Sequence, residues 1–200
     1  MSDRAQDVHE EWPVVSSEDL FRTGLPFALR SDRIRMPDEP DGEPFARVVL
    51  EHPGAAVILA LDEDERVLCL RQYRHPVRRR MLELPAGLMD HDGEEPEQVA
   101  RRELTEEAGV QAQSWTHLAS TYSSPGITEE LLHVFLARDL SPAEASATEG
   151  FVAEHEEADM ELLWVPFADL LAAVLDGRVA DAPVVIAVLL ARAKGLVGLP

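Results

Sequence analysis

The stretch that decides the fold of this chain is Gly87-Leu-Met-Asp-His-Asp-Gly-Glu-Glu-Pro-Glu-Gln-Val-Ala-Arg-Arg-Glu-Leu-Thr-Glu-Glu-Ala-Gly-Val110, a glycine-containing loop that leads into a short, carboxylate-rich helix. Pro96 suits the first helical position, where its missing N–H would have no partner, and Gly109 suits the left-handed residue after a helix. Together they predict a helix over roughly 95–108. Apolar residues recur there at every fourth position and form one stripe to bury: Ala100, Leu104 and Ala108.

Three carboxylates of this segment lie within about one helical turn: Glu103, Glu106 and Glu107. Residues three or four positions apart share a helix face, so their like charges repel. Glu106 and Glu107 also fall in the last turn, where the helix dipole is negative and Lys or Arg would be more stabilising. A hard divalent cation, Mg²⁺ or Mn²⁺, takes oxygen ligands and would offset this repulsion. Glu103 and Glu107 point the same way and can share such an ion.

Composition limits the kind of protein and its partners. A chain of 200 residues with 46% hydrophobic content can bury the core of one principal domain, with a small subdomain attached. The net charge of −20 argues against nucleic acid or an anionic membrane surface as the main partner, because both would be repelled. A phosphate-bearing ligand must therefore be held by local arginines or by a metal ion.

The location expected from the sequence is the cytoplasm. The single cysteine, Cys69, cannot form an intramolecular disulfide and lies in an apolar run, as expected for a buried thiol in a reducing compartment. Residues 1–12 are polar and acidic and lack the apolar core of a signal peptide. No run approaches the roughly 18 apolar residues that a membrane-spanning helix needs.

The order of patterns along the chain predicts three regions. Residues 1–12 are expected to form a disordered tail, 13–50 a small β subdomain that mediates dimerisation, and 51–200 the main domain. The main domain interleaves strands and helices, so its class is mixed α/β (α+β) with a mixed sheet. The expected strands are 55–61 and 67–70 as a hairpin, 81–84, 115–122 paired with 131–137, and 160–165; the expected closing helices are 166–175 and 182–194.

The glycine, arginine and glutamates of this stretch resemble the signature that defines the Nudix hydrolases. The matching positions are Gly87, Glu94, Arg102, Glu103, Leu104, Glu106, Glu107, Gly109 and Val110. Six residues separate Gly87 from Glu94, one more than in the family pattern, which we interpret as a loop extension that leaves the helix register intact. The resemblance implies the Nudix α/β/α sandwich with a mixed sheet, preceded here by the N-terminal β subdomain.

The resemblance also implies roles for the residues of the signature. Glu103 and Glu107 would be the first ligands of Mg²⁺ or Mn²⁺, joined by the carbonyl of Ala86. Glu106 would be a third ligand or a catalytic residue beside the ligands, and Arg102 and Glu94 would form a structural pair that ties the loop to the helix. Clustered cations neutralise phosphate oxygens, lower the pKa of a bound water and stabilise the leaving phosphate, which is what pyrophosphate hydrolysis requires.

Residues outside the signature resemble the ADP-ribose pyrophosphatase branch of the family. Pro125 lies sixteen residues after Gly109, a spacing associated with ADP-ribose hydrolysis, and Gly126 follows it. By similarity Arg74 would bind phosphate and Glu130 a polar group of the ribose or adenine, whereas a surface salt bridge is the alternative for Arg74. Arg47 would reach a ligand in the partner subunit, although its position is at least as compatible with an arginine that has no functional role.

An acidic segment, 155–159, precedes the last strand. A run of charge there is most often a solvated loop, but in this branch a glutamate on the corresponding loop is the general base. We assign that role to Glu157 first and to Glu156 second. Tyr122 and Trp164 are expected to pack in the core rather than to stack on a base.

The sequence therefore predicts a cytoplasmic, homodimeric Nudix hydrolase that cleaves ADP-ribose to AMP and ribose 5-phosphate with Mg²⁺ or Mn²⁺. The first alternative is the same chemistry on another nucleoside diphosphate sugar, such as ADP-glucose or GDP-mannose, because the carboxylates act on the pyrophosphate and do not contact the sugar. A non-catalytic ADP-ribose sensor is a further alternative, which the intact carboxylates and the lack of a basic nucleic-acid-binding surface disfavour.

Overall fold

A computed structural model describes residues 5–22, 26–91, 93–144 and 159–198 of the chain. The chain divides into two compact units. The smaller unit contains residues 1–52 and 124–129, and the larger contains residues 53–123 and 130–200. Each unit is described separately below.

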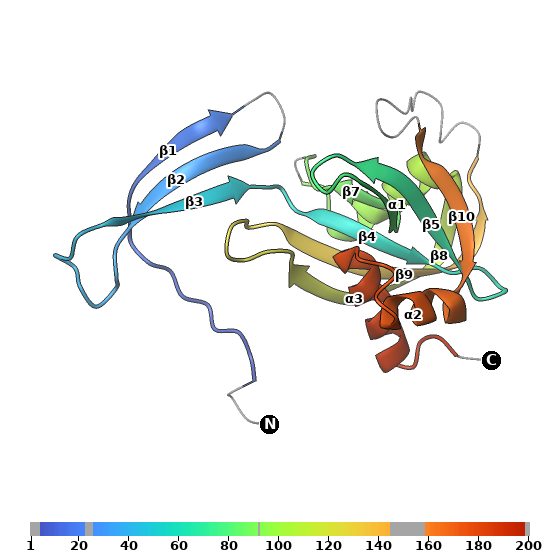
Figure 1. Ribbon diagram of the computed structural model, residues 1–200. Coiled ribbons are helices and arrows are strands. Elements are labelled where there is room, and N and C mark those ends of the chain that lie inside the picture. The colour runs from blue at the N-terminus through green and yellow to red at the C-terminus, as the bar shows by residue number, and fades with distance from the viewer. Residues whose placement is uncertain (1–4, 23–25, 92, 145–158, 199–200) are drawn as a thin grey trace. The chain divides into compact units, whose positions relative to one another are not determined.

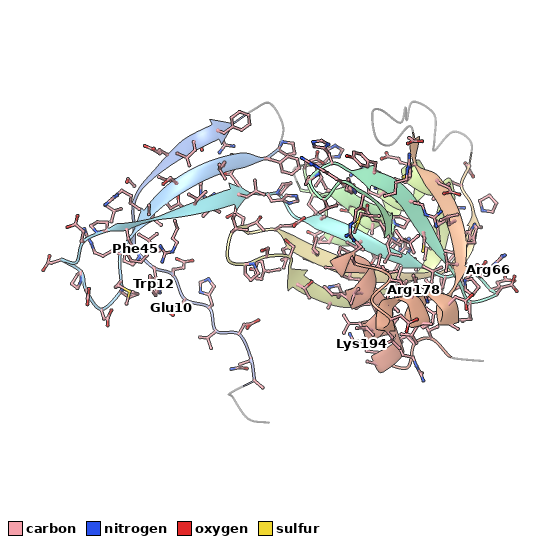
Figure 2. The ribbon with its side chains drawn as sticks, in the orientation of Figure 1. Glu10, Trp12, Phe45, Arg66, Arg178 and Lys194 are labelled. Carbon is pink, nitrogen blue, oxygen red and sulfur yellow. The ribbon has the colours of Figure 1, made fainter. Side chains whose placement is uncertain are left out.

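The smaller unit is built on a three-stranded antiparallel sheet in the order β1-β2-β3, with β1 at Val14–Arg22, β2 at Ala28–Ile34 and β3 at Phe45–Glu51. An ion pair of 3.1 Å between Arg30 of β2 and Glu51 of β3 joins two of its strands. The Arg30 guanidinium also contacts Asp32 of its own strand at 3.1 Å and Glu129 at 3.2 Å. Before β1, the Trp12 ring meets the Phe45 ring edge-on at 6.4 Å between centroids (Figure 2).

The same sheet carries apolar side chains that the chain itself leaves exposed. Every residue of β1 is exposed. The exposed apolar residues of the three strands are Val14, Val15, Leu20, Phe21, Val48 and Leu50. Exposed apolar surface on this scale, mixed with ion pairs, is typical of a protein–protein contact area.

The described residues of the larger unit form two sheets and three helices. One sheet has the order β7-β4-β9-β8 and the other the order β10-β5-β6. The strands are β4 (Ala55–Ala60), β5 (Arg66–Arg74), β6 (Arg79–Glu83), β7 (Ala86–Leu88), β8 (Val110–Tyr122), β9 (Leu131–Pro142) and β10 (Glu161–Pro166). The helices are α1 (Pro96–Ala108), α2 (Phe167–Leu175) and α3 (Ala182–Ala193).

Strand β4 is the centre of the larger unit. It pairs in parallel with β9 and antiparallel with β7, and all six of its residues are buried. Its odd-numbered residues pack in one core with α2 and α3, and its even-numbered residues pack in a second core with α1. Helices therefore cover both faces of a mixed sheet, which confirms the α/β/α sandwich (Figure 1).

The helix predicted from Pro96 and Gly109 is present with nearly the predicted limits. Pro96 begins α1 after the capping residue Glu95, whose side chain and that of Gln98 bond each other's backbone N–H groups. Gly109 ends the helix in the left-handed conformation, with φ of 62°. Leu104 and Ala100 are fully buried, so the predicted stripe faces the core, although Ala108 is only partly buried.

The predicted hairpin of 55–61 with 67–70 is wrong. An isolated bridge joins Leu61, the residue after β4, to Val67 of β5, but the two strands belong to different sheets. The Asp62 carboxylate accepts the N–H groups of Asp64 and Arg66 and closes the turn between them. Both faces of β4 are apolar, and a central position between β7 and β9 buries both of them, which pairing with β5 in a hairpin would not require.

The expectation that Tyr122 and Trp164 pack in the core is wrong, because their exposed fractions are 58% and 40%. Both lie on edge strands, β8 and β10, where one face meets solvent. The Arg66 guanidinium lies 5.9 Å from the Trp164 ring centre. Cys69 is buried as predicted, and burial raises the pKa of its thiol to about 12. Among the helices of the described residues, none has the length and apolar content needed to span a bilayer.

Candidate active site

The carboxylates of α1 lie against the short strand β7. A Cβ atom on Gly87 would lie 2.0 Å from both the Cδ and the Oε1 atoms of Glu103, far inside the contact distance of two atoms. The Glu103 side chain thus occupies the space that any other residue at position 87 would fill. The glycine of the signature is therefore required because it admits a carboxylate, and its backbone conformation is not the reason.

Glu107 reaches the same strand one turn further along α1. Its Oε2 atom accepts a hydrogen bond of 3.1 Å from the backbone N–H of Ala86. Glu103 and Glu107 therefore both face the Ala86–Gly87 backbone, as the i,i+4 spacing predicts. The carbonyl oxygen of Ala86 belongs to the same short segment of β7, so the oxygen donors predicted as ligands come from two adjacent elements.

Arg102 lies in the middle of the carboxylate cluster. Its Nη1 atom donates to Glu103 at 2.6 Å and to Glu106 at 2.9 Å, whereas its contact with Glu94 is longer, at 3.4 Å. The expected Arg102–Glu94 pair is thus present, but the guanidinium bonds more closely to the helix glutamates. Within the described ranges, no three Asp, Glu, His or Cys side chains converge as a group that could hold a metal ion.

The chemistry of the cluster nevertheless fits a cation. Burial raises the pKa of Glu103, and the charge of Arg102 offsets part of that rise, while Glu106 and Asp90 add to it. An anionic carboxylate is thus unfavourable at this position unless positive charge is near it. All candidate donors are oxygens, which Mg²⁺ and Mn²⁺ prefer. The space next to Gly87 holds the carboxylate that such an ion would bind.

Arg74 takes part in a buried polar network that the sequence did not reveal. Its guanidinium donates to the Glu83 carboxylate at 2.7 and 2.9 Å, and Gln72 donates to the same carboxylate at 2.9 Å. Glu83 is only 8% exposed. Arg74 therefore forms a salt bridge, the alternative considered from the sequence, and its partner is Glu83. Half of the Arg74 side chain remains exposed. The only sequence signal for Glu83 was a carboxylate between two leucines, Leu82 and Leu84.

Asp181 is a second carboxylate that sequence reasoning left without a role. It is the N-cap residue of α3, where its side chain accepts the N–H of Val184 at 3.0 Å. Burial raises the pKa of Asp181 to about 6, Glu83 adds to the rise, and the Val184 N–H and the Arg74 charge oppose it. The Asp181 carboxylate, at the start of α3, therefore interacts electrostatically with Arg74 and Glu83.

We expect the stability of the protein to change with pH through Asp181. Its folded-state pKa of about 6 exceeds the ordinary pKa of 3.8 for an Asp carboxyl, so its contribution is fully present below about pH 4 and is lost as pH rises to about 6. Asp181→Asn keeps a capping oxygen but removes the titration. In urea unfolding, the stability of the unchanged protein should fall by about 1.4 kcal/mol between pH 5 and pH 8 through this group, and the variant should lack that fall. Equal pH dependence in both proteins would contradict this assignment.

The remaining predicted residues are placed as follows. Glu130, in the larger unit, accepts a hydrogen bond from the Ser123 hydroxyl. Arg47 belongs to the smaller unit, where its guanidinium lies 4.4 Å from the Phe45 ring centre and donates to the Ala46 carbonyl. Pro125 and Gly126 lie in a turn of the same unit, closed by the bond from Ile127 N–H to Ser124 O. Glu156 and Glu157 lie outside the described residues.

Comparison with known proteins decides the family of this fold and site. Residues 50–188 match the NUDIX domain. The chain belongs to the NUDIX family. The resemblance seen in the signature is thereby confirmed, and the carboxylate helix, β7 and the Arg74–Glu83 pair all lie inside the matched NUDIX region.

Relatives with known names cover most of this NUDIX chain. The ADP-ribose pyrophosphatase of Mycobacterium tuberculosis is 42% identical over 92% of this chain and 84% of its own length. The ADP-ribose pyrophosphatase of Bacillus subtilis is 36% identical, over 86% and 88%. The GDP-mannose pyrophosphatase of Yersinia enterocolitica is 33% identical, over 72% and 75%. A crystal structure of an ADP compounds hydrolase, 22% identical, shares the fold with a TM-score of 0.73, covering 96% of this chain and 98% of its own.

Proposed function

We propose that this protein hydrolyses the pyrophosphate bond of ADP-ribose to AMP and ribose 5-phosphate with the help of Mg²⁺ or Mn²⁺. The observation that carries the proposal is the placement of Glu103 and Glu107 against the Ala86–Gly87 backbone, a set of oxygen donors on a NUDIX helix. Two relatives that span most of the chain are named ADP-ribose pyrophosphatases, which supports the choice of substrate.

The residues that would hold the metal are Glu103, Glu107, Glu106 and the Ala86 carbonyl. When bound, the ion supplies positive charge to the phosphate oxygens and lowers the pKa of a water molecule. The chain prepares this site in two ways. The missing side chain of Gly87 admits the Glu103 carboxylate, and the Ala86 N–H orients the Glu107 carboxylate through a bond of 3.1 Å.

Binding of the diphosphate must overcome the net charge of −20. Arg74 is suited to this because Glu83 fixes its guanidinium by three hydrogen bonds while half of the side chain stays open to a ligand. We further propose that Glu130 binds a polar group of the nucleoside or ribose, and that Arg47, Pro125 and Gly126 contribute to substrate binding. Glu157, or else Glu156, remains our proposed general base, and Glu106 a catalytic residue beside the ligands.

We also propose that the protein acts as a cytoplasmic homodimer without a nucleic-acid or membrane partner. The exposed apolar residues of β1 and β3, including Phe21 at 64% exposure, support a contact between two copies of this sheet. The acidic net charge disfavours an anionic polymer or bilayer as a partner. The buried thiol of Cys69 agrees with a reducing compartment.

The second candidate substrate is another nucleoside diphosphate sugar, and one observation favours keeping it. A relative named GDP-mannose pyrophosphatase covers 72% of this chain at 33% identity. The carboxylates proposed as metal ligands act on the diphosphate and do not contact the sugar, so they do not discriminate between ADP-ribose and another nucleoside diphosphate sugar. The sensor alternative is weaker, because Glu103, Glu106 and Glu107 are all retained.

A hydrolysis screen tests the choice of substrate. The full chain is assayed with Mg²⁺ on ADP-ribose, ADP-glucose, GDP-mannose, NADH and diadenosine polyphosphates, and kcat/KM is measured for each. We expect ADP-ribose to exceed each of the others by at least about tenfold, a difference of 1.4 kcal/mol in transition-state binding. Comparable values for all five would overturn the ADP-ribose assignment, and a maximum for GDP-mannose would favour the second candidate.

A further inference from the structure

Two histidines outside the carboxylate cluster point at the same oxygen atom. The Nε2 atom of His117 lies 3.0 Å from the Ser120 hydroxyl oxygen, and the Nδ1 atom of His133 lies 2.9 Å from the same oxygen. His117 and Ser120 are on β8 and His133 is on β9. Two imidazole nitrogens thus converge on one small region, although the residues come from different strands.

A β-bulge produces this convergence. Side chains alternate along a strand, so His117 and Ser120, three positions apart, would face opposite sides of a regular sheet. The register of β8 shifts between His117 and Ala119, so that His117 opposes Phe135 and Ser120 opposes His133. All four side chains therefore share the α1 face of the sheet. Bulges often re-aim a side chain at a functional position.

The residues around the two imidazoles leave them accessible to a ligand and restrict the orientation of their rings. The His117 ring lies 5.3 Å from the ring of Phe135, which is almost fully buried, while His117 itself and Ser120 are exposed. Burial lowers the pKa of His133, and the neighbouring His117 lowers it further, so the neutral form of the ring is favoured. Neutral imidazole is the form that ligates metal ions.

The pair is separate from the carboxylate cluster. Ala56 of β4 opposes His133 on one side and Gly87 on the other, so two strand spacings separate the histidine from the glycine. This corresponds to a distance on the order of 10 Å. Nitrogen donors also select different ions, because imidazole suits Zn²⁺ and Cu²⁺ whereas carboxylates suit Mg²⁺.

We propose that His117 and His133 form a binding site for a divalent transition-metal ion of the Zn²⁺ or Cu²⁺ class, next to Ser120. The ligating atoms are His117 Nε2 and His133 Nδ1, so the protons of the two rings reside on Nδ1 and Nε2 respectively. The Ser120 hydroxyl supplies a neutral oxygen donor or a hydrogen bond to a coordinated water, and solvent fills the remaining positions. The site needs no residue of the carboxylate cluster.

Electron paramagnetic resonance of added Cu²⁺ tests the site without using enzyme activity. The full chain, free of any affinity tag, is titrated with Cu²⁺ in excess Mg²⁺, which competes at sites made only of oxygen. We expect one tightly bound Cu²⁺ with hyperfine coupling to two nitrogens. His117→Ala and His133→Ala should each remove one nitrogen and weaken binding by at least about tenfold, equivalent to 1.4 kcal/mol.

Matched variants make the result decisive. His9→Ala removes an exposed histidine of the smaller unit and should leave Cu²⁺ binding unchanged. His133→Gln keeps a hydrogen-bonding side chain at the half-buried position, and its circular dichroism should match that of the unchanged protein. The proposal would be overturned if the His117→Ala or His133→Gln protein kept the Cu²⁺ affinity of the unchanged protein and coupling to two nitrogens. It would also be overturned if the Cu²⁺ spectrum of the unchanged protein showed no coupling to nitrogen.

Discussion

Replacing Glu107 with glutamine is expected to lower kcat for ADP-ribose hydrolysis by about 10²–10³-fold, the effect of losing roughly 3–4 kcal/mol of transition-state stabilisation by a metal ion. The amide oxygen of glutamine can still accept the bond from Ala86 N–H, so the fold and the side-chain position are preserved. The change removes one negative charge, and with it most of the affinity for the ion. Steady-state kinetics across a Mg²⁺ titration measures both effects.

The same substitution should not destabilise the protein in EDTA. Removing one of the three clustered carboxylates from the last turn of α1 relieves repulsion worth a few tenths of a kcal/mol. The matched control is Glu97→Gln, on the exposed side of the same helix, where the carboxylate pairs with Arg101 at 2.8 Å. We expect near-normal kcat for the control. An active Glu107→Gln enzyme with normal Mg²⁺ dependence would contradict the proposed metal site.

Gly87→Ala is expected to displace the Glu103 carboxylate and to lower activity. The new Cβ would lie 2.0 Å from the Glu103 carboxylate, so either Glu103 leaves β7 or the strand moves away from α1. A displacement of about 1 Å at a catalytic group can lower the rate by about 10²-fold, and overpacking of this kind costs about 1–3 kcal/mol of stability. We expect kcat/KM to fall by about that factor and the thermal midpoint to decrease.

Gly198→Ala is the control for this methyl group. No heavy atom lies within 4 Å of the position that its Cβ would take, and its φ is not in the left-handed range. Activity and thermal midpoint should be unchanged in that variant. If Gly87→Ala retained full activity, the contact between Gly87 and Glu103 would have no catalytic importance, and the basis for placing the ligand set against β7 would be lost.

The parts of the fold that sequence predicted well depend on local chemistry. Pro96 and Gly109 define the two ends of α1 through the missing N–H of proline and the left-handed conformation of glycine, and neither needs a distant partner. The i,i+4 spacing likewise placed Glu103 and Glu107 on one side of the helix. The ends of β8 and β9 were less well predicted, because alternation weakens where strands leave the core.

The error at β4 and β5 shows what local patterns miss. Both segments are apolar, and the polar turn at 62–66 resembles a hairpin loop, so adjacency in sequence suggested pairing. The actual partner of β4 is β9, which follows more than seventy residues later. Parallel pairing is decided by burial of both faces of the strand, and that depends on helices from distant parts of the chain.

Side-chain networks were the least predictable feature of the candidate site. The antiparallel register of β5 and β6 pairs Leu70 with Glu83 and Arg74 with Arg79. Glu83 therefore shares a face with Arg74, whose long side chain reaches along that face to the carboxylate. Asp181 joins them electrostatically from the start of α3. No spacing rule in the sequence connects these three residues. The closeness of Arg102 to Glu103 and Glu106 similarly depends on rotamers that a pattern does not specify.

The parallel pairing of β4 with β9 has a consequence for synthesis on the ribosome. Residues of α1 leave the exit tunnel before β9 does, so the carboxylate helix is complete while the central strand still lacks one of its two neighbours. A nascent chain that ends before Leu131 exposes the apolar edge of β4 and the apolar stripe of α1 together. The face of β4 that packs on α1 is completed only when β9 has emerged, and the opposite face only when α2 and α3 follow, so the two cores of the larger unit close one after the other during synthesis.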